Sequence, residues 1–204
     1  AELDLNGASD KLILDADADT TISADTDDQI DFKAGGTDVM SMTATGLTIN
    51  DGTTITTADN TDTLTLISTD ADATNGPNLR MYRNSASPAD NDELGILRFD
   101  GRNDNSEDIT FAQIKATVAD ASDGTEDAVL NIQKMVAGTS KNVLKFSETE
   151  AVFNEGSQDL DFRVESDTLS HALFVDAGLD QVNVGSNTDY SALVGVIQAK
   201  ADHR

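Results

Sequence analysis

The sequence predicts an all-β protein: an elongated, intertwined homotrimeric fibre of short strands, with a triple β-helix or β-prism-like shaft and a central antiparallel β meander. Its 204 residues include 30 Asp but only 8 Glu, together with 23 Thr. Glu favours helices, whereas Asp favours turns and Thr favours strands. Short apolar pairs with a period of two recur between these polar residues, which indicates many short strands joined by turns.

The supply of core-forming residues is small. Leu, Ile, Val and Phe together number 47, about 23% of the chain, close to the roughly 20% level below which a highly charged chain is expected to be disordered. A monomer of this length normally buries a thick core. The composition therefore leaves three alternatives: a disordered chain, a very flat β protein, or a subunit that completes its core with copies of itself.

Residues 1–69 are interpreted as an acidic β-repeat shaft. Its apolar positions are Leu12 with Leu14, Ile22, Ile30 with Phe32, Met40 with Met42, Leu47 with Ile49, Ile55, and Leu64 with Leu66. Turn signals such as Gly35-Gly36 separate these positions. Each short strand offers too few apolar side chains to stabilise a sheet alone. We therefore expect three copies to wind around one axis, with the apolar pairs inside and the strand edges hidden.

An internal repeat supports this interpretation. Residues 28–33 (Asp-Gln-Ile-Asp-Phe-Lys) reappear in similar form as residues 158–163 (Gln-Asp-Leu-Asp-Phe-Arg), and each copy is followed by two further apolar stretches. Such repeats imply units that bury one face against a neighbour.

Residues 70–153 are predicted to form a central antiparallel β domain, and residues 154–204 a C-terminal β segment. The expected central strands are Leu79 to Arg83, Leu94 to Phe99, Ile109 to Val118, Ala128 to Met135, and Val143 to Phe146. Ile96 with Phe99, or Ile114 with Val118, are the expected core members. The tail from Tyr190 to Ala201 is expected to be a short helix or another strand.

Several stretches resemble a module frequent in the tail fibres of bacteriophages, particularly marine phages. They are residues 86–90 (Ala-Ser-Pro-Ala-Asp), 111–114 (Phe-Ala-Gln-Ile), 123–127 (Asp-Gly-Thr-Glu-Asp) and 161–167 (Asp-Phe-Arg-Val-Glu-Ser-Asp). The acidic residues 25–32 resemble repeats of the same fibres. The resemblance implies a trimeric, β-rich virion fibre, and it carries over no catalytic residues.

Charge and composition exclude several classes of function. The formal net charge is -25, which repels phosphate over most of the surface, so we expect no nucleic-acid partner. No apolar run approaches 18 residues, so we expect no membrane insertion. Cys is absent and His171 and His203 are the two histidines, which leaves almost no material for a catalytic triad or a multi-His metal site.

Carboxylate clusters are the strongest chemical candidates. Asp15, Asp17 and Asp19 alternate, so in an extended segment all three point to one side. Asp70 and Asp72 stand in a stretch with a faint likeness to a calcium loop. Hard cations prefer several oxygen ligands, so calcium binding by these five residues is one alternative, and solvated turn carboxylates are the expected one. We expect no other cofactor.

The most basic stretch contains Arg80, Arg83, Arg98 and Arg102. We expect these side chains to form ion pairs with nearby Asp residues, with a bridge between subunits as the alternative. The expected partners are Asp90, Asp92, Asp100 and Asp104.

The residues and the resemblance together predict a structural virion fibre, a phage tail fibre that is extracellular, assembles as a homotrimer and contributes to host attachment. Its expected partners are its own copies, other tail, baseplate or capsid proteins, and a host surface receptor reached through a distal region. The alternatives are a capsid decoration or head-fibre protein, a bacterial surface adhesin or filament subunit, and a polysaccharide-degrading tailspike. We expect no enzymatic activity.

Overall fold

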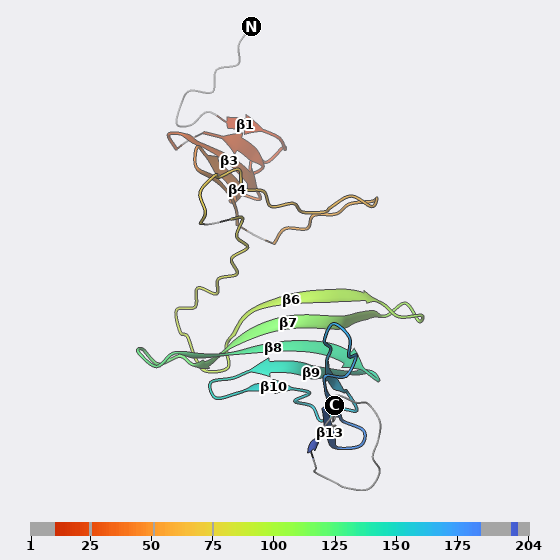
Figure 1. Cartoon of the computed structure of the whole chain (residues 1–204). Helices are drawn as coiled ribbons and strands as arrows, with labels where there is room; N and C mark the ends of the chain where they lie inside the picture. Colours follow the sequence, from red (N-terminus) through yellow and green to blue (C-terminus); the bar gives the residue numbers. More distant parts are fainter. Residues whose placement is uncertain (1–10, 25, 51, 75, 185–196, 200–204) are drawn as a thin grey trace. The chain divides into compact units, whose positions relative to one another are not determined.

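The structure is a computed structural model that describes residues 11–24, 26–50, 52–74, 76–184 and 197–199. All regular structure in these residues is β, with fourteen strands and no helix (Figure 1). The strands form three open sheets of five, five and four strands. Every pairing is antiparallel except that of the last two strands. The all-β prediction is confirmed.

The chain divides into two compact units, residues 1–78 and residues 79–204. The first unit contains the first five-stranded sheet, called sheet A. The second unit contains the other five-stranded sheet, sheet B, and the four-stranded sheet, sheet C. The three-part division predicted from the sequence, with boundaries after residues 69 and 153, stays a prediction.

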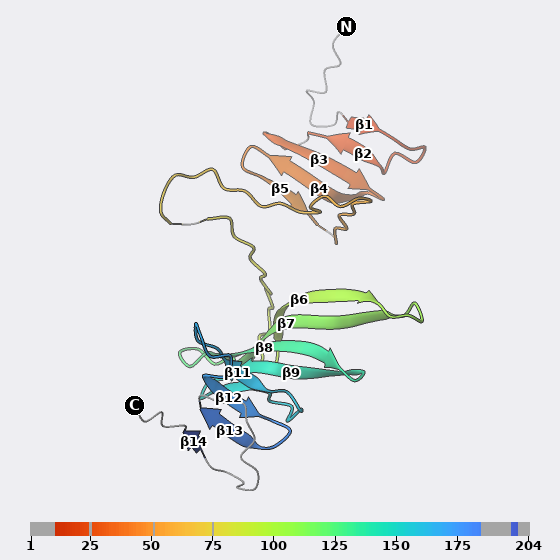
Figure 2. The ribbon, with the colours of Figure 1, turned by 45° about the vertical axis from the view of Figure 1, so that its right-hand side comes forward.

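Sheet A is a meander whose spatial order follows the chain (Figure 2). Gly35 and Gly36 join two of its strands, with φ of 58° and 74°. A two-residue turn with positive φ at both positions matches the twist of a hairpin, and glycine adopts it without strain. The strands are β1 (Lys11–Ile13), β2 (Thr21–Ser23), β3 (Gln29–Ala34), β4 (Thr37–Thr43) and β5 (Gly46–Ile49).

Sheet B is also a meander, and its strands are longer. The register shifts at four places, once each in the β7–β8 and β8–β9 pairings and twice between β6 and β7. Such bulges increase the local twist of a sheet. The strands are β6 (Glu93–Arg102), β7 (Asp108–Asp120), β8 (Asp127–Val136), β9 (Thr139–Phe146) and β10 (Ala151–Phe153).

Sheet C repeats part of sheet A. Met42 faces Leu47 and Met40 faces Ile49 in the β4–β5 pairing, and the corresponding residues of the repeat pair in the same way in β12–β13. The sequence repeat therefore corresponds to a repeated hairpin. The strands are β11 (Phe162–Val164), β12 (Leu173–Asp176), β13 (Gln181–Val184) and β14 (Ile197–Ala199).

Each sheet separates apolar from polar side chains. Directly opposed residues of an antiparallel pair lie on the same face, and so do residues two apart along a strand. The registers of sheet A therefore place most of its apolar side chains on one face: Leu12, Ile22, Ile30, Phe32, Met40, Met42, Leu47 and Ile49. Ile13, opposite Thr21, is an exception. Thr21, Ser23 and Asp31 lie on the other face and are buried.

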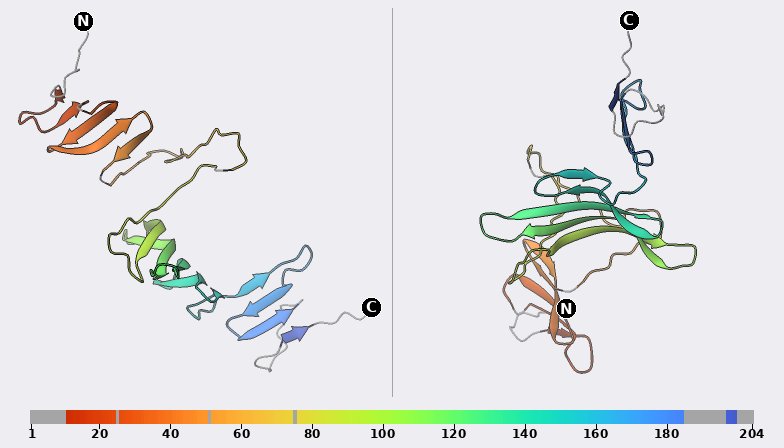
Figure 3. Two further views of the ribbon diagram at one scale, coloured as in Figure 1. Left: turned by 90° about the vertical axis from the view of Figure 1, so that its left-hand side faces the viewer. Right: turned by 90° about the horizontal axis from the view of Figure 1, so that it is seen from below.

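No hydrophobic core exists in the described part of the chain. Phe174, 9% exposed, is its only buried apolar residue. Each sheet is a single layer (Figure 3). The expected core residues of the central domain are not buried: Ile96 and Val118 are half-buried, and Phe99 and Ile114 are exposed.

Three predicted strands are wrong. Residues 52–74 and 76–92 contain no strand, so the expected strands at Ile55, at Leu64 with Leu66, and at Leu79 to Arg83 do not form. Their side chains alternate as strand residues do, but no neighbouring segment pairs with them. The predicted helix or strand over Tyr190 to Ala201 lies mostly outside the described residues, and Ile197–Ala199 within it forms β14.

Candidate functional site

Sheet B gathers apolar side chains from all five of its strands on one face. Its central row crosses all five strands as Leu97, Ile114, Ile132, Leu144 and Phe153. Gly95, Ala116, Leu130, Phe146 and Ala151 form the next row. Two adjacent rows on one face span four residues at about 3.3 Å each, and five strands lie about 4.8 Å apart, so the two apolar rows present about 300 Å².

Much of this face is exposed to solvent, although Met81 covers part of the Gly95 row, where a Cβ on Gly95 would lie 3.0 Å from its Sδ. Leu97, Ile114, Leu130, Phe146 and Phe153 are all exposed, with Phe153 at 55%. An apolar patch of this size is comparable to the largest patch of a typical soluble monomer, and such a patch is often functional. Sheets A and C present smaller apolar faces of the same kind.

The opposite face of sheet B is polar, and several of its side chains bond to one another, although the buried Oδ1 of Asn131 has no hydrogen-bond partner in the described chain. Gln113 donates to Gln133, and Gln133 donates to Asn142 at 2.5 Å, so a row of side-chain amides crosses β7, β8 and β9. Lys115 and Glu93 form an ion pair at 3.2 Å. A face with such interactions suits water, so the two faces of the sheet have different environments.

One ion pair on this side also raises a pKa. Lys145 donates to Glu155 at 2.9 Å. This hydrogen bond, reinforced by the charge of Glu155, raises the pKa of Lys145 above its usual value of 10.5. Lys145 is therefore charged at neutral pH, and it fixes the chain that follows β10 against β9.

A groove of about 520 Å³ lies where β10 of sheet B meets β11 and β12 of sheet C. The rings of Phe153 and Phe162 form part of its wall, with their centroids 4.7 Å apart. Three carboxylates, those of Asp159, Asp161 and Asp180, also line it. The groove thus combines aromatic surface with acceptor oxygens.

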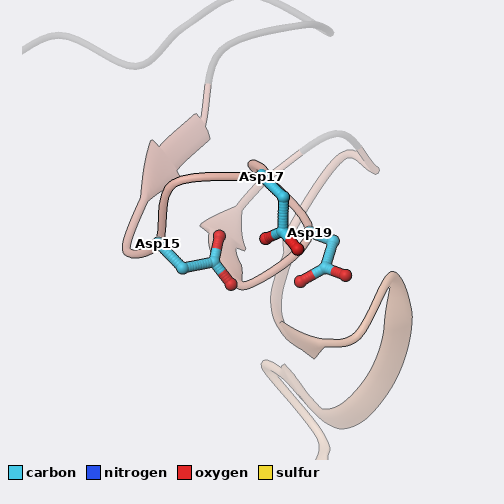
Figure 4. Close-up of side chains that lie close together, drawn as sticks. All are labelled: Asp15, Asp17 and Asp19. Carbon is cyan, nitrogen blue, oxygen red and sulfur yellow. The ribbon is translucent and has the colours of Figure 1, made fainter.

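Asp15, Asp17 and Asp19 come together on the β1–β2 connection (Figure 4). One carboxylate oxygen of each lies within 4.8 Å of the others. The prediction that an extended segment aligns the three side chains is wrong. The segment is bent, and Ala18 has a φ of 62°. Lys11 supports the bend by donating from Nζ to the carbonyl of Ala18 at 3.2 Å.

The carboxyl of Asp15 is held ionised. Hydrogen bonds from Thr20, including one from its backbone N–H at 3.2 Å, lower the pKa of Asp15 below its usual value of 3.8. The structure brings together one oxygen from each of these three exposed or half-exposed carboxylates, against the six to eight ligands that calcium takes, so the cluster by itself is an incomplete site. Calcium binding there stays a prediction.

Asp70 and Asp72 are not part of a three-carboxylate group among the described residues. Asp70 accepts a hydrogen bond from the N–H of Asp72 at 3.0 Å, which is a local turn. The structure thus brings three of the five metal candidates together and leaves the other two in a solvated turn.

The basic stretch follows the prediction in part. Arg83 pairs with Asp92 at 2.9 Å, as expected, whereas Arg102 pairs with Asp108 instead of an expected partner. Arg80 lies over the ring of Tyr82, 4.6 Å from its centroid. Arg98 pairs with no residue that the structure describes.

The groove and its two aromatic rings were not found from the sequence. Phe153 and Phe162 belong to different predicted regions, and no local pattern says that they meet. The repeat offered a weak signal, because Phe162 is the counterpart of Phe32 on the apolar face of sheet A.

Comparisons with protein-family models, with curated proteins and with solved structures find no match to the chain. The resemblance to phage tail fibres therefore stays a prediction. Among the described residues there is no helix with the length and apolar character required to cross a bilayer.

Proposed function

We propose that this chain is a structural fibre subunit that assembles as a homotrimer, with its sheets packed around a common axis by their apolar faces. One observation carries the proposal: three single-layer sheets, each apolar on one face, bury only one apolar residue in the described chain. An element with one apolar face must bury that face against another element. The open apolar rows of sheet B, about 300 Å², supply part of the roughly 800 Å² that each partner contributes to a stable interface.

Three copies satisfy both faces of each sheet. The apolar faces meet at the axis, while the amide row and the ion pairs remain in water. Winding of the copies around one axis also offers partners to the outer strands of each sheet, which otherwise invite uncontrolled pairing. The charge of -25 on each chain opposes side-to-side association of finished trimers.

The role that suits such an assembly is mechanical. A trimer with interlocked strands unfolds slowly, because many strands must separate together. We therefore propose a virion fibre, a phage tail fibre, that projects from the particle and contributes to host attachment. The acidic, Thr-rich composition and the short repeats support this proposal, together with the resemblance of residues 86–90, 111–114, 123–127 and 161–167 to such fibres.

Mass measurement tests the assembly. Light scattering during size-exclusion chromatography at micromolar concentration is expected to give three times 21.5 kDa. A folded monomer would refute the proposal. A dimer, in which two sheets stack face to face, would refute the threefold arrangement.

Immunogold labelling tests the location. Antibodies against this chain, applied to intact phage particles that encode it, are expected to label the tail appendage. Label on the capsid would instead identify a head-fibre protein, and label on the bacterial surface alone would identify an adhesin.

A further inference from the structure

Two lysines on sheet B oppose each other without a counter-charge. Lys134 and Lys141 are direct partners in the β8–β9 register, so their side chains lie on the same face. By alternation from Ile132, this is the apolar face. Like charges in this position are destabilising. Neither lysine forms an ion pair with a residue that the structure describes, in a chain where acidic residues outnumber basic ones by 38 to 13.

The groove between sheets B and C has carboxylates that lack a positively charged partner. Asp159 and Asp180 line it, and within the described chain neither carboxylate has a hydrogen-bond or ion-pair partner. Both residues are exposed, and the carboxylate of Asp159 lies beside Gly178, where a Cβ would be 2.9 Å from its Oδ1. The groove therefore offers acceptor oxygens to a donor-rich, positively charged group.

Both features lie at the same end of sheet B. Val143, which lines the groove, is two residues from Lys141, and the N–H of Asn154 donates to the carbonyl of Val143 at 3.0 Å. A Cβ on Gly156, in the turn that leads to the groove, would lie 3.5 Å from Cδ of Lys141. In a ring of identical subunits, groups at the same height along the axis are the ones that meet between neighbours.

We infer that Lys134 and Lys141 of one copy of this chain form ion pairs with Asp159 and Asp180 of the next copy. The occupant of the groove is thus a second copy. Its charge complements the carboxylates, and the aromatic wall of the groove belongs to the apolar faces that the assembly buries. The contact is head-to-tail, so three copies close a ring with three equivalent junctions. This inference rests on the proposed homotrimer and identifies the residues that set its register.

Charge reversal tests the junction in the full chain. The double variant Lys134→Glu/Lys141→Glu places four carboxylates at each junction, and the concentration at which half of the chains are assembled is expected to rise by about tenfold or more. The variant Asp159→Lys/Asp180→Lys is expected to have the same defect. The quadruple variant that combines all four changes restores opposite charges, and its assembly is expected to return to the wild-type level.

The rescue separates this inference from simple loss of folding and from failure of the proposed function. A quadruple variant as weak as the two doubles would overturn the inference, and so would doubles that assemble as well as the wild type. In either case a trimeric wild type would leave the proposed function standing. A monomeric wild type would remove both.

Crosslinking gives a second readout, and the absence of native Cys makes it unambiguous. A Lys134→Cys chain is co-expressed with a differently tagged Asp180→Cys chain and oxidised. Covalent dimers that contain both tags are expected on non-reducing gels. Failure of these dimers to form in a trimeric sample would overturn the inference, because the two positions would then not meet between copies.

Discussion

Residues 93–153 and residues 52–92 both carry alternating apolar side chains, yet only the first region forms a sheet. In sheet B each strand has a neighbour that matches its register, from Leu97 opposite Ile114 to Leu144 opposite Phe153. In the second region, where residue 75 is not described, Leu64, Ile67 and Leu79 stand 60%, 77% and 68% exposed without a strand partner. Alternation therefore predicts which side chains a strand would bury, whereas a partner decides whether the strand forms.

The largest expected effect comes from placing a charge on the apolar face of sheet B. Leu97 and Arg98 are neighbours on β6 that lie on opposite faces, and both are exposed in the single chain. Leu97→Asp is expected to abolish the trimer at micromolar concentration, because burial of an unpaired carboxylate costs several kcal/mol. Light scattering measures the mass of the assembly.

Arg98→Asp is the matched control, because it introduces the same side chain one residue away on the polar face. It is expected to remain trimeric. If Leu97→Asp and Arg98→Asp give the same assembly mass, the two faces of sheet B do not differ in their role in assembly.

The next effect concerns the region without strands. If assembly supplies the missing partners, backbone amides within residues 53–74 are expected to exchange with deuterium about tenfold or more slowly in the trimer than in an unassembled variant such as Leu97→Asp. Tenfold corresponds to about 1.4 kcal/mol of local stability. Mass spectrometry of peptic peptides reports the exchange, with a peptide from β7–β8 as a reference. Equal exchange in both samples would show that this region is a linker in the assembly too.

Part of the fold could be predicted from the sequence, because local chemistry determines it. Gly35-Gly36 forms the predicted turn, and the alternation of Ile30 with Phe32 and of Met40 with Met42 identifies the apolar face of sheet A. These features depend on residues close in the chain.

The rest depends on contacts that a single sequence does not contain. The ring contact of Phe153 with Phe162 depends on how sheets B and C meet. Asp15, Asp17 and Asp19 were expected together in an extended segment, and the positive φ of Ala18 brings them together in a bend instead. Leu64 and Leu66 have the pattern of a strand but no neighbour.

A smaller effect is expected from the amide row of sheet B. Gln133 joins Gln113 to Asn142 across three strands. Gln133→Ala removes two part-buried hydrogen bonds, each of which contributes about 1 kcal/mol, so the free energy of unfolding is expected to fall by about 2 kcal/mol. Urea denaturation of the trimer measures this loss. An unchanged midpoint would show that water replaces the amide row without cost.

The smallest effect lies in the turns, which the two regions share. Hydrogen bonds from Ser122 lower the pKa of Asp120, the last residue of β7, and hydrogen bonds from Thr61 lower the pKa of Asp59 in the region without strands. The backbone N of Ser122 lies 2.8 Å from Oδ1 of Asp120, and the backbone N of Thr61 lies 3.0 Å from Oδ1 of Asp59. Both regions therefore form Asp turns, whether or not strands follow them.

The sign of the pH dependence follows from the direction of these shifts. A carboxyl with a lowered pKa in the folded chain contributes stability that is complete above its ordinary pKa of 3.8 and is lost as the pH falls through the folded value. NMR titration of the two carboxyls is expected to give midpoints below 3.8 for both, and the Asp120 midpoint is expected to return to 3.8 in urea as sheet B unfolds. A midpoint at or above 3.8 for Asp59 alone would show that the turn at Asp59 forms only with a neighbouring segment, in the same way that strand formation requires one.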